Sequence, residues 1–372
     1  MYTRFGDNDI VNRQAQELVT STWTNNVNNL QGQFTSSLTT FGTPTSSGQF
    51  FIEVLNADQS SSTAATQFYL SYGHRYGSGS PDFTNDTGSF GLNASRVIYN
   101  QYRQLHYNDD TKFFTFGTHT PDDIFVININ RANYKQRLTL GSLNLNISGT
   151  VKGLAAPEDG GTQNLIHLTD DSVTNPAGAG TSNLGTYYNL VSGSSGVIRA
   201  GDSSLTQLGG SSSFGHVYPE AGIIILNGDI FSSSAANATA QNSCAPIRGK
   251  SDSDNTNRNH LKLFHHMSQN DGNAIHTGGS NGHFIVDTTE EINSEFYFCR
   301  ARNDQFNYTN NESFVDNNNN IRFETMQLNP KVFITTVGLY NDAFELLAIA
   351  KLSQPVAKDF TKEALIRVKL DY

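Results

Sequence analysis

The stretch that decides the fold lies near the end of the sequence and reads Lys331-Val-Phe-Ile-Thr-Thr-Val-Gly-Leu-Tyr-Asn-Asp-Ala-Phe-Glu-Leu-Leu-Ala-Ile-Ala-Lys-Leu-Ser353. Two apolar runs flank the turn signal Asn341-Asp342, which predicts that residues 334–340 and 346–352 pair as antiparallel strands. Both faces of the first strand carry apolar or β-branched side chains. We therefore expect other parts of the protein to cover this strand on both sides.

A third run of strand-like sequence closes the chain. Ile366, Val368 and Leu370 alternate with charged residues, which is typical of a half-buried strand. The three runs together predict a C-terminal β-meander. Further strands are expected at residues 49–55, 66–76, 113–117, 122–130, 138–147, 217–226 and 295–302. The predicted fold class is α+β and β-dominated, with antiparallel sheets and a few short helices.

Helical spacing of apolar residues occurs in three segments, 7–23, 95–107 and 259–267. In the first of them Val11, Ala15, Leu18, Thr22 and Trp23 fall on one stripe, which predicts an N-terminal helix. Such a stripe must be covered either by the core of the same chain or by a partner. We therefore take Val11, Leu18 and Trp23 as candidate interface residues.

Three segments are expected along the 372 residues. Residues 1–94 would hold the N-terminal helix, strands and a docking region, residues 95–258 a mixed β domain with long loops, and residues 259–372 a C-terminal β domain. Charged residues make up only 16% of the chain, against the ~25% that is typical. Asn, Ser, Thr and Gly supply the polarity instead, which suits either a protein packed against neighbours or a β-rich protein with many turns.

Charge and hydropathy argue against two classes of partner. The net charge is −10 and no long basic run occurs, so nucleic-acid binding is not expected. The longest apolar run, residues 221–226, is too short to span a bilayer, so no membrane partner is expected. Cys244 and Cys299 define no disulfide framework and the first residues show no apolar signal segment, which predicts assembly in a reducing compartment.

No pattern in the sequence predicts catalysis. The histidines at 265, 266, 276 and 283 lack the spacing of a zinc site. Residues 252–257 resemble the start of a calcium loop but lack its glycine at position six and its glutamate at position twelve. The carboxylate pairs Asp170-Asp171 and Glu290-Glu291 are neighbours in sequence, whereas glycoside hydrolysis needs carboxyls that converge from separate elements. We expect no catalytic residue, no metal ion, no cofactor and no enzymatic activity.

Several segments resemble virion structural proteins of contractile-tailed phages, especially T4-like cyanophages. They are residues 120–135, 217–226, 298–310, 334–342 and 350–355, and the likeness extends over residues 95–372. The first ninety residues have no counterpart in that family. We therefore expect subunit-specific docking to lie in them.

The resemblance implies a structural subunit of the phage tail, with the baseplate as its expected position. Its partners would be other tail or baseplate proteins, in a homo-oligomer or symmetric multi-copy assembly that forms in the host cytoplasm and stays in the virion. A neck, collar or fibre-attachment protein is the alternative within this class. A glycan- or receptor-binding module, or a polysaccharide depolymerase, is the alternative of another class.

Overall fold

The computed structural model describes residues 3–6, 8–23, 35–36, 51–56, 60–77, 94–148, 165–198, 213–228, 263, 267, 284–307 and 312–371. The chain divides into two compact units. We call Val19–Glu290 the central unit, and Met1–Leu18 together with Glu291–Tyr372 the terminal unit. The expected boundaries at residues 94 and 258 both fall inside the central unit. The predicted fold class is confirmed, because antiparallel sheets dominate both units and the described elements include a single α-helix.

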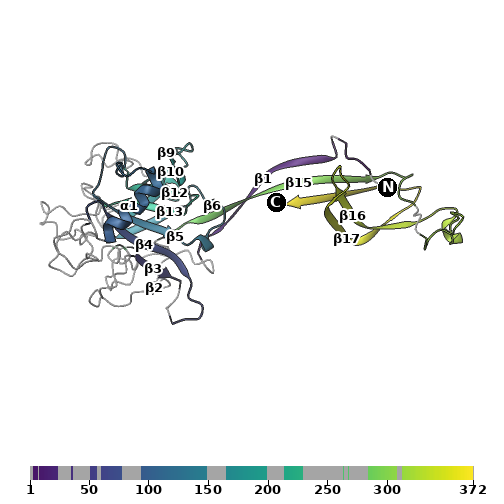
Figure 1. Cartoon of the computed structure of the whole chain (residues 1–372), viewed down its shortest axis with the longest axis horizontal. Helices are drawn as coiled ribbons and strands as arrows, with labels where there is room; N and C mark the ends of the chain where they lie inside the picture. Colours follow the sequence, from purple (N-terminus) through teal and green to yellow (C-terminus); the bar gives the residue numbers. More distant parts are fainter. Residues whose placement is uncertain are drawn as a thin grey trace. The chain divides into compact units, whose positions relative to one another are not determined.

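The central unit is built on an antiparallel sheet of 12 strands in the order β14-β7-β8-β10-β12-β13-β5-β4-β3-β2, with β9 and β11 also paired to β10 (Figure 1). The strands are β2 Thr35–Ser36, β3 Phe51–Leu55, β4 Thr66–His74, β5 Asp123–Ile129, β7 Asn144–Ser148, β8 Leu165–Asp170, β9 Gly180–Ser182, β10 Gly185–Ser194, β11 Val197–Ile198, β12 Gly215–Tyr218, β13 Ile223–Asn227 and β14 Phe284–Ile285.

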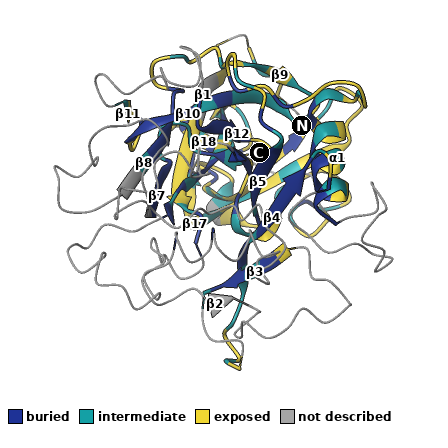
Figure 2. Ribbon diagram, turned by 90° about the vertical axis from the view of Figure 1, so that its left-hand side faces the viewer, coloured by how far each residue is buried: buried dark blue, intermediate teal, exposed yellow. Residues whose placement is uncertain are grey.

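The middle of this sheet is buried on both faces, as the colouring of β5 in Figure 2 shows. On β5, Phe125 and Ile127 point into one apolar core, whereas Ile124 and Val126 point into a second core on the opposite face. Strand β13 alternates in the same way. This two-sided burial explains why both strands are nearly continuous apolar runs in the sequence.

The predicted helix at 95–107 is confirmed as α1, Ala94–Tyr107. Its apolar stripe, which includes Ile98, Tyr99 and Tyr102, belongs to the second core. Gly73 on β4 allows the helix to lie close to the sheet, because a Cβ atom at this position would stand 2.9 Å from the backbone nitrogen of Tyr99. The short side chain therefore sets how closely helix and sheet pack.

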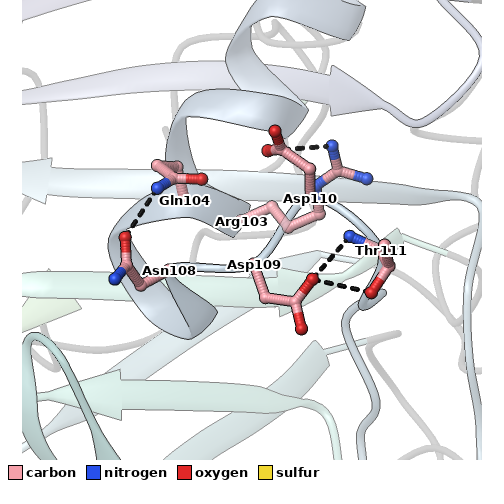
Figure 3. Close-up of polar contacts among 6 residues, drawn as sticks. All are labelled: Arg103, Gln104, Asn108, Asp109, Asp110 and Thr111. Atoms are coloured by element: carbon pink, nitrogen blue, oxygen red, sulfur yellow. Dashed lines mark hydrogen bonds and ion pairs between the residues drawn. The ribbon is translucent and has the colours of Figure 1, made fainter.

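The end of α1 turns the chain back over its own helix (Figure 3). Asn108 takes a positive φ of 51°, and Gln104 Nε2 donates a hydrogen bond of 2.7 Å to Asn108 Oδ1. Asp109 Oδ1 then accepts hydrogen bonds from the backbone nitrogen and Oγ1 of Thr111, at 2.8 and 2.6 Å. These bonds stabilise the turn that leads into the buried residues Phe114 and Phe116.

Three of the expected strands differ in the structure. Residues 113–117 form a loop whose contact with the second core comes from Phe114 and Phe116, and only an isolated bridge joins Phe116 to His119. Residues 138–147 divide into β6, Arg137–Leu138, and β7, because a turn with Gly141 at φ 75° separates them. Residues 217–226 form the hairpin β12–β13 rather than one strand, because the chain reverses through Gly222 at φ 65°.

Leu263 and Met267 are helical and fully buried in the first core of the central unit. At these two positions the structure agrees with the helix that the sequence predicts for 259–267. The other residues of that segment lie outside the described part of the chain.

The predicted N-terminal helix is wrong. Residues 10–21 form the strand β1, Ile10–Ser21, which pairs with β15, Asp287–Ala301. Apolar residues three and four apart fit a helix, but this segment is also rich in β-branched Ile, Val and Thr, and a long ladder partner is available in β15. The sheet is completed by β18, Ala364–Asp371, and by the short strand β6, both paired with β15.

The last three strands do not form one meander. Strands β16, Val332–Tyr340, and β17, Leu346–Lys358, form a separate two-stranded sheet. Strand β18 instead pairs with β15 over eight residue pairs, from Ser294↔Asp371 to Ala301↔Ala364. The alternation of apolar and charged residues in β18 predicts the strand correctly, but it carries no information about which strand is its neighbour.

Candidate interaction surface

The hairpin β16–β17 of the terminal unit has the predicted pairing. Val337 pairs with Ala350, and Leu339 pairs with Ala348. Hydrogen bonds across the turn close the hairpin: the backbone nitrogen of Glu345 donates to Asn341 Oδ1 at 2.8 Å, and Asn341 Nδ2 donates to Glu345 Oε2 at 2.7 Å. The Asn side chain thus supplies the turn that the sequence predicts for this position.

The prediction that other parts of the protein cover strand β16 on both sides is wrong for the described residues. Phe333 is 62% exposed, Leu347 69% and Ile349 58%, and Phe344 in the turn is also largely exposed. Leu339 is the buried member of β16. The hairpin therefore leaves large apolar side chains exposed on both of its faces, because Ile349 pairs with Gly338 whereas Phe333 points to the other side of β16. We call this set the hairpin surface and define it by Phe333, Phe344, Leu347 and Ile349.

A cavity of about 810 Å³ lies beside β16 within the terminal unit. Its apolar walls come from the N-terminal segment, β15, β16 and β18, with Phe5, Phe298, Val337, Leu339 and Ile366 among the lining residues. The N-terminal segment is held against β15, because the backbone nitrogen of Phe298 donates to the carbonyl of Asp9 at 2.8 Å. Phe344 of the hairpin surface also lines this cavity.

Polar and charged side chains also line this cavity, among them Arg4, Asp9, Arg300 and Asp342. Arg4 Nη2 stands 3.7 Å from Asp342 Oδ1, and both side chains are almost fully exposed. Cys299 carries a free thiol, and burial together with the Asp9 carboxylate raises its pKa, so that the thiol form dominates at pH 7. The wall therefore combines apolar contacts with charged groups at its border.

The structure does not bring the three candidate interface residues together. Val11 is 46% exposed and Leu18 45%, but they lie seven residues apart on a strand, so they occupy opposite faces in regular β geometry. Trp23 is only 2% exposed and belongs to the core of the central unit. Its Nε1 donates to the carbonyl of Phe284 at 2.9 Å, and its ring lies 4.9 Å from the ring of Phe284.

The hairpin surface was missed because apolar residues on both faces of a strand normally indicate burial. A signal was nevertheless present: Lys351 is the only charged residue in the run 346–357. Depletion of charge together with large apolar side chains is also the composition of an interface core. Composition alone does not distinguish burial within the chain from burial against a partner.

The structure does not assemble a metal or acid site from the described residues that the sequence analysis considered for one. Residues 252–257 and the histidines at 265, 266, 276 and 283 lie outside the described part of the chain. Asp171 Oδ1 accepts a hydrogen bond of 2.8 Å from the backbone nitrogen of Asn189, and Asp170 accepts one of 3.0 Å from Gly141. Within the described residues, no group of three or more His, Cys, Asp or Glu side chains is placed to hold a metal ion.

Comparison with protein-family models, with curated protein sequences and with solved structures finds no match to this chain. In the described part of the chain, α1 and the shorter helical segments are neither long nor apolar enough to cross a membrane.

Proposed function

We propose that this protein is a structural subunit of a phage contractile tail, positioned in the baseplate, where neighbouring subunits cover its hairpin surface. The observation that supports this proposal most strongly is the set of exposed side chains Phe333, Phe344, Leu347 and Ile349. Large apolar side chains that a folded unit leaves exposed together on one hairpin are typical of protein–protein interaction sites. The resemblance of residues 95–372 to tail structural proteins supplies the kind of neighbour.

The two strands of the hairpin differ in how they present their free edges. Strand β17 carries Lys351, Pro355 and Lys358, and both lysine and proline discourage the addition of a further strand. Strand β16 has neither a charged residue nor a proline between Val332 and Tyr340. Within the described residues β16 pairs with β17 alone. Its other edge is therefore suited to pair with a strand of a neighbouring subunit.

A pair of leucine variants tests this proposal. Leu347→Asp places a charge in the hairpin surface, and Leu328→Asp places the same charge at a residue that is 97% exposed elsewhere in the terminal unit. Each tagged variant is expressed in host cells during infection, and tails are purified from the lysate. Leu347→Asp should be depleted from the tails at least about tenfold relative to Leu328→Asp, because a buried unpaired charge costs several kcal/mol at an interface.

Two results would count against the proposal. Equal incorporation of the two variants would show that the hairpin surface is not the contact. Absence of the wild-type protein from purified tails would remove the tail assignment itself. Labelling the incorporated protein and locating it by electron microscopy distinguishes the baseplate from the neck, the collar or a fibre-attachment position.

A further inference from the structure

A second cavity, of about 600 Å³, lies wholly within the central unit. It is bounded by the loop after α1, by the loop that follows β8, and by β10 and β12. Its volume is within the range of small-molecule sites, roughly 300–1,000 Å³. The lining residues are mainly polar or small: Thr115, Gly117, Asp171, Thr174, Asn175, Gly178, Ala179, Tyr187, Asn189, Val191, Ile198, Ser213 and His216.

One wall is formed by the rings of Tyr187 and His216, whose centroids are 4.5 Å apart. His216 is buried, and its Nδ1 has no hydrogen-bond partner within the described residues. Burial, with a smaller effect of His106, lowers the pKa of His216 to about 3, so the ring is neutral at pH 7. A neutral imidazole offers one donor and one acceptor, and a buried nitrogen without a partner is costly unless a ligand or water satisfies it.

Asp171 and Asn189 stand next to these rings, because Asn189 pairs with His216 across β10 and β12. The backbone nitrogen and Nδ2 of Asn189 donate to the two carboxylate oxygens of Asp171, at 2.8 and 3.0 Å. The carbonyl of Asp171 in turn accepts from the backbone nitrogens of Thr174 and Asn175, at 3.1 and 2.8 Å. These bonds fix the loop that carries most of the polar lining, so the wall is formed before any ligand arrives.

Glycines keep this loop close to Tyr187. A Cβ atom on Gly180 would stand 2.5 Å from Tyr187 Oη, and one on Gly178, at φ 82°, would stand 2.5 Å from Thr186 Cγ2. Because neither position has room for a side chain, the phenol ring packs directly on the backbone of the loop. The ring is thereby held in one orientation, at the border of the cavity.

We propose that this cavity binds a neutral saccharide. An aromatic ring provides the contact for the C–H face of a sugar, and amide, hydroxyl and carboxylate groups provide both donors and acceptors for its hydroxyls. No Lys or Arg occurs among the described lining residues, and the Asp171 carboxylate repels an anionic ligand. A single carboxylate whose oxygens already accept from Asn189 is a poor cation site, and the polar lining disfavours an apolar ligand.

This cavity is distinct from the hairpin surface proposed to act in tail assembly. It lies in the central unit and would bind a small ligand, whereas the hairpin surface lies in the terminal unit. The full-length protein is screened against neutral mono- and oligosaccharides built from glucose, galactose and N-acetylglucosamine, by calorimetry and saturation-transfer NMR. Glucuronate serves as the anionic counterpart of glucose. We expect at least one neutral sugar to bind with a Kd on the order of 1 mM, and to bind more tightly than glucuronate.

Three tyrosine variants then locate the binding. Tyr187→Ala should weaken it about tenfold, Tyr187→Phe should retain most of it, and Tyr76→Ala, at an exposed tyrosine of the same unit, should leave it unchanged. If Tyr187→Ala unfolds the central unit, the ring ¹⁵N signals of His216 in the wild-type protein decide, because a sugar in the cavity shifts them. The proposal is overturned if no neutral sugar binds, if glucuronate binds as tightly, or if binding leaves both Tyr187 variants and the His216 signals unaffected.

Discussion

The central strands β5 and β13 and the hairpin strands β16 and β17 have similar apolar sequences but opposite surroundings. Ile127 and Ile224 are fully buried between two cores, whereas Phe333 and Ile349 remain mostly exposed. Strand β5 is covered on one face by α1 and its loop, and the described residues supply no such cover for the hairpin surface. An apolar strand therefore indicates that a cover exists, but not which molecule provides it.

The largest effect on the free energy of unfolding is expected from a substitution of Trp23. This variant tests whether Trp23 belongs to the core or to a docking surface. Trp23→Ala should lower the free energy of unfolding of the central unit by about 3–5 kcal/mol, because it removes a large buried ring and leaves the Phe284 carbonyl without its donor. Leu18→Ala is the control and should change stability by about 0.5 kcal/mol or less. Urea unfolding followed by circular dichroism measures both, and equal effects would contradict the core assignment.

Acid should destabilise the two units at different pH values. All ten histidines lie in the central unit, and burial lowers the pKa of His106 to about 4 and that of His216 to about 3. Below the unfolded pKa of about 6.5 the unfolded chain binds protons that the folded unit does not. The central unit should therefore lose roughly 3–4 kcal/mol of stability between pH 7 and pH 5, with about half from each histidine.

Fluorescence of the single Trp, which lies in the central unit, follows this loss. His216→Phe should flatten the profile, and His119→Phe, at a half-exposed ring, should not. The terminal unit is expected to respond only near the ordinary pKa of aspartate, since hydrogen bonds lower the pKa values of Asp316 and Asp359. A terminal unit that destabilises already at pH 6 would contradict this contrast.

A smaller effect is expected at the buried cation of the terminal unit. Lys358 is fully buried, and its Nζ donates to Asn307 Oδ1 at 2.6 Å and to the Asn303 carbonyl at 3.3 Å. Asn307→Ala should cost about 1.5–3 kcal/mol, because it removes an acceptor from a buried charge. Hydrogen exchange of the amides of β15 and β18 reports the change, and Asn318→Ala, at an exposed asparagine, is the control. A loss of protection in both variants alike would rule out a specific role for Asn307.

The smallest effect on folding is expected at the hairpin surface. Leu347→Ser should change the stability of the isolated protein by about 0.5 kcal/mol or less, because the side chain is mostly exposed. Ile127→Ser, in the middle of β5, is the matched comparison and should destabilise the central unit severely. If Leu347→Ser also lowers the melting temperature strongly, the hairpin surface is covered within the chain itself.

The sequence was sufficient where the pattern is local. Helix α1 followed from its stripe, strands β3, β4 and β5 from their β-branched and aromatic runs, and the hairpin β16–β17 from its apolar runs and its turn. Each of these signals is contained in about fifteen residues or fewer. Even the turn type of the hairpin depends on one side chain, Asn341, that is visible in the sequence.

The sequence failed where the outcome depends on a distant partner. Residues 10–21 carry a spacing that suits a helix, and only the ladder with β15 makes them a strand. Strand β18 joins β15 rather than β17 for the same non-local reason. The cavity of the central unit combines residues from separate loops and strands, such as Asp171 and His216, so no linear motif could reveal it.

The discontinuity of the terminal unit has a consequence for how the protein is made. Strand β1 is synthesised before the central unit, but its partner β15 and the neighbouring β18 are synthesised after most or all of it. Since domains generally fold as units during synthesis, the central unit has time to fold while β1 waits for its partner. The sheet of β1, β15 and β18 is therefore completed only after the central unit has been synthesised.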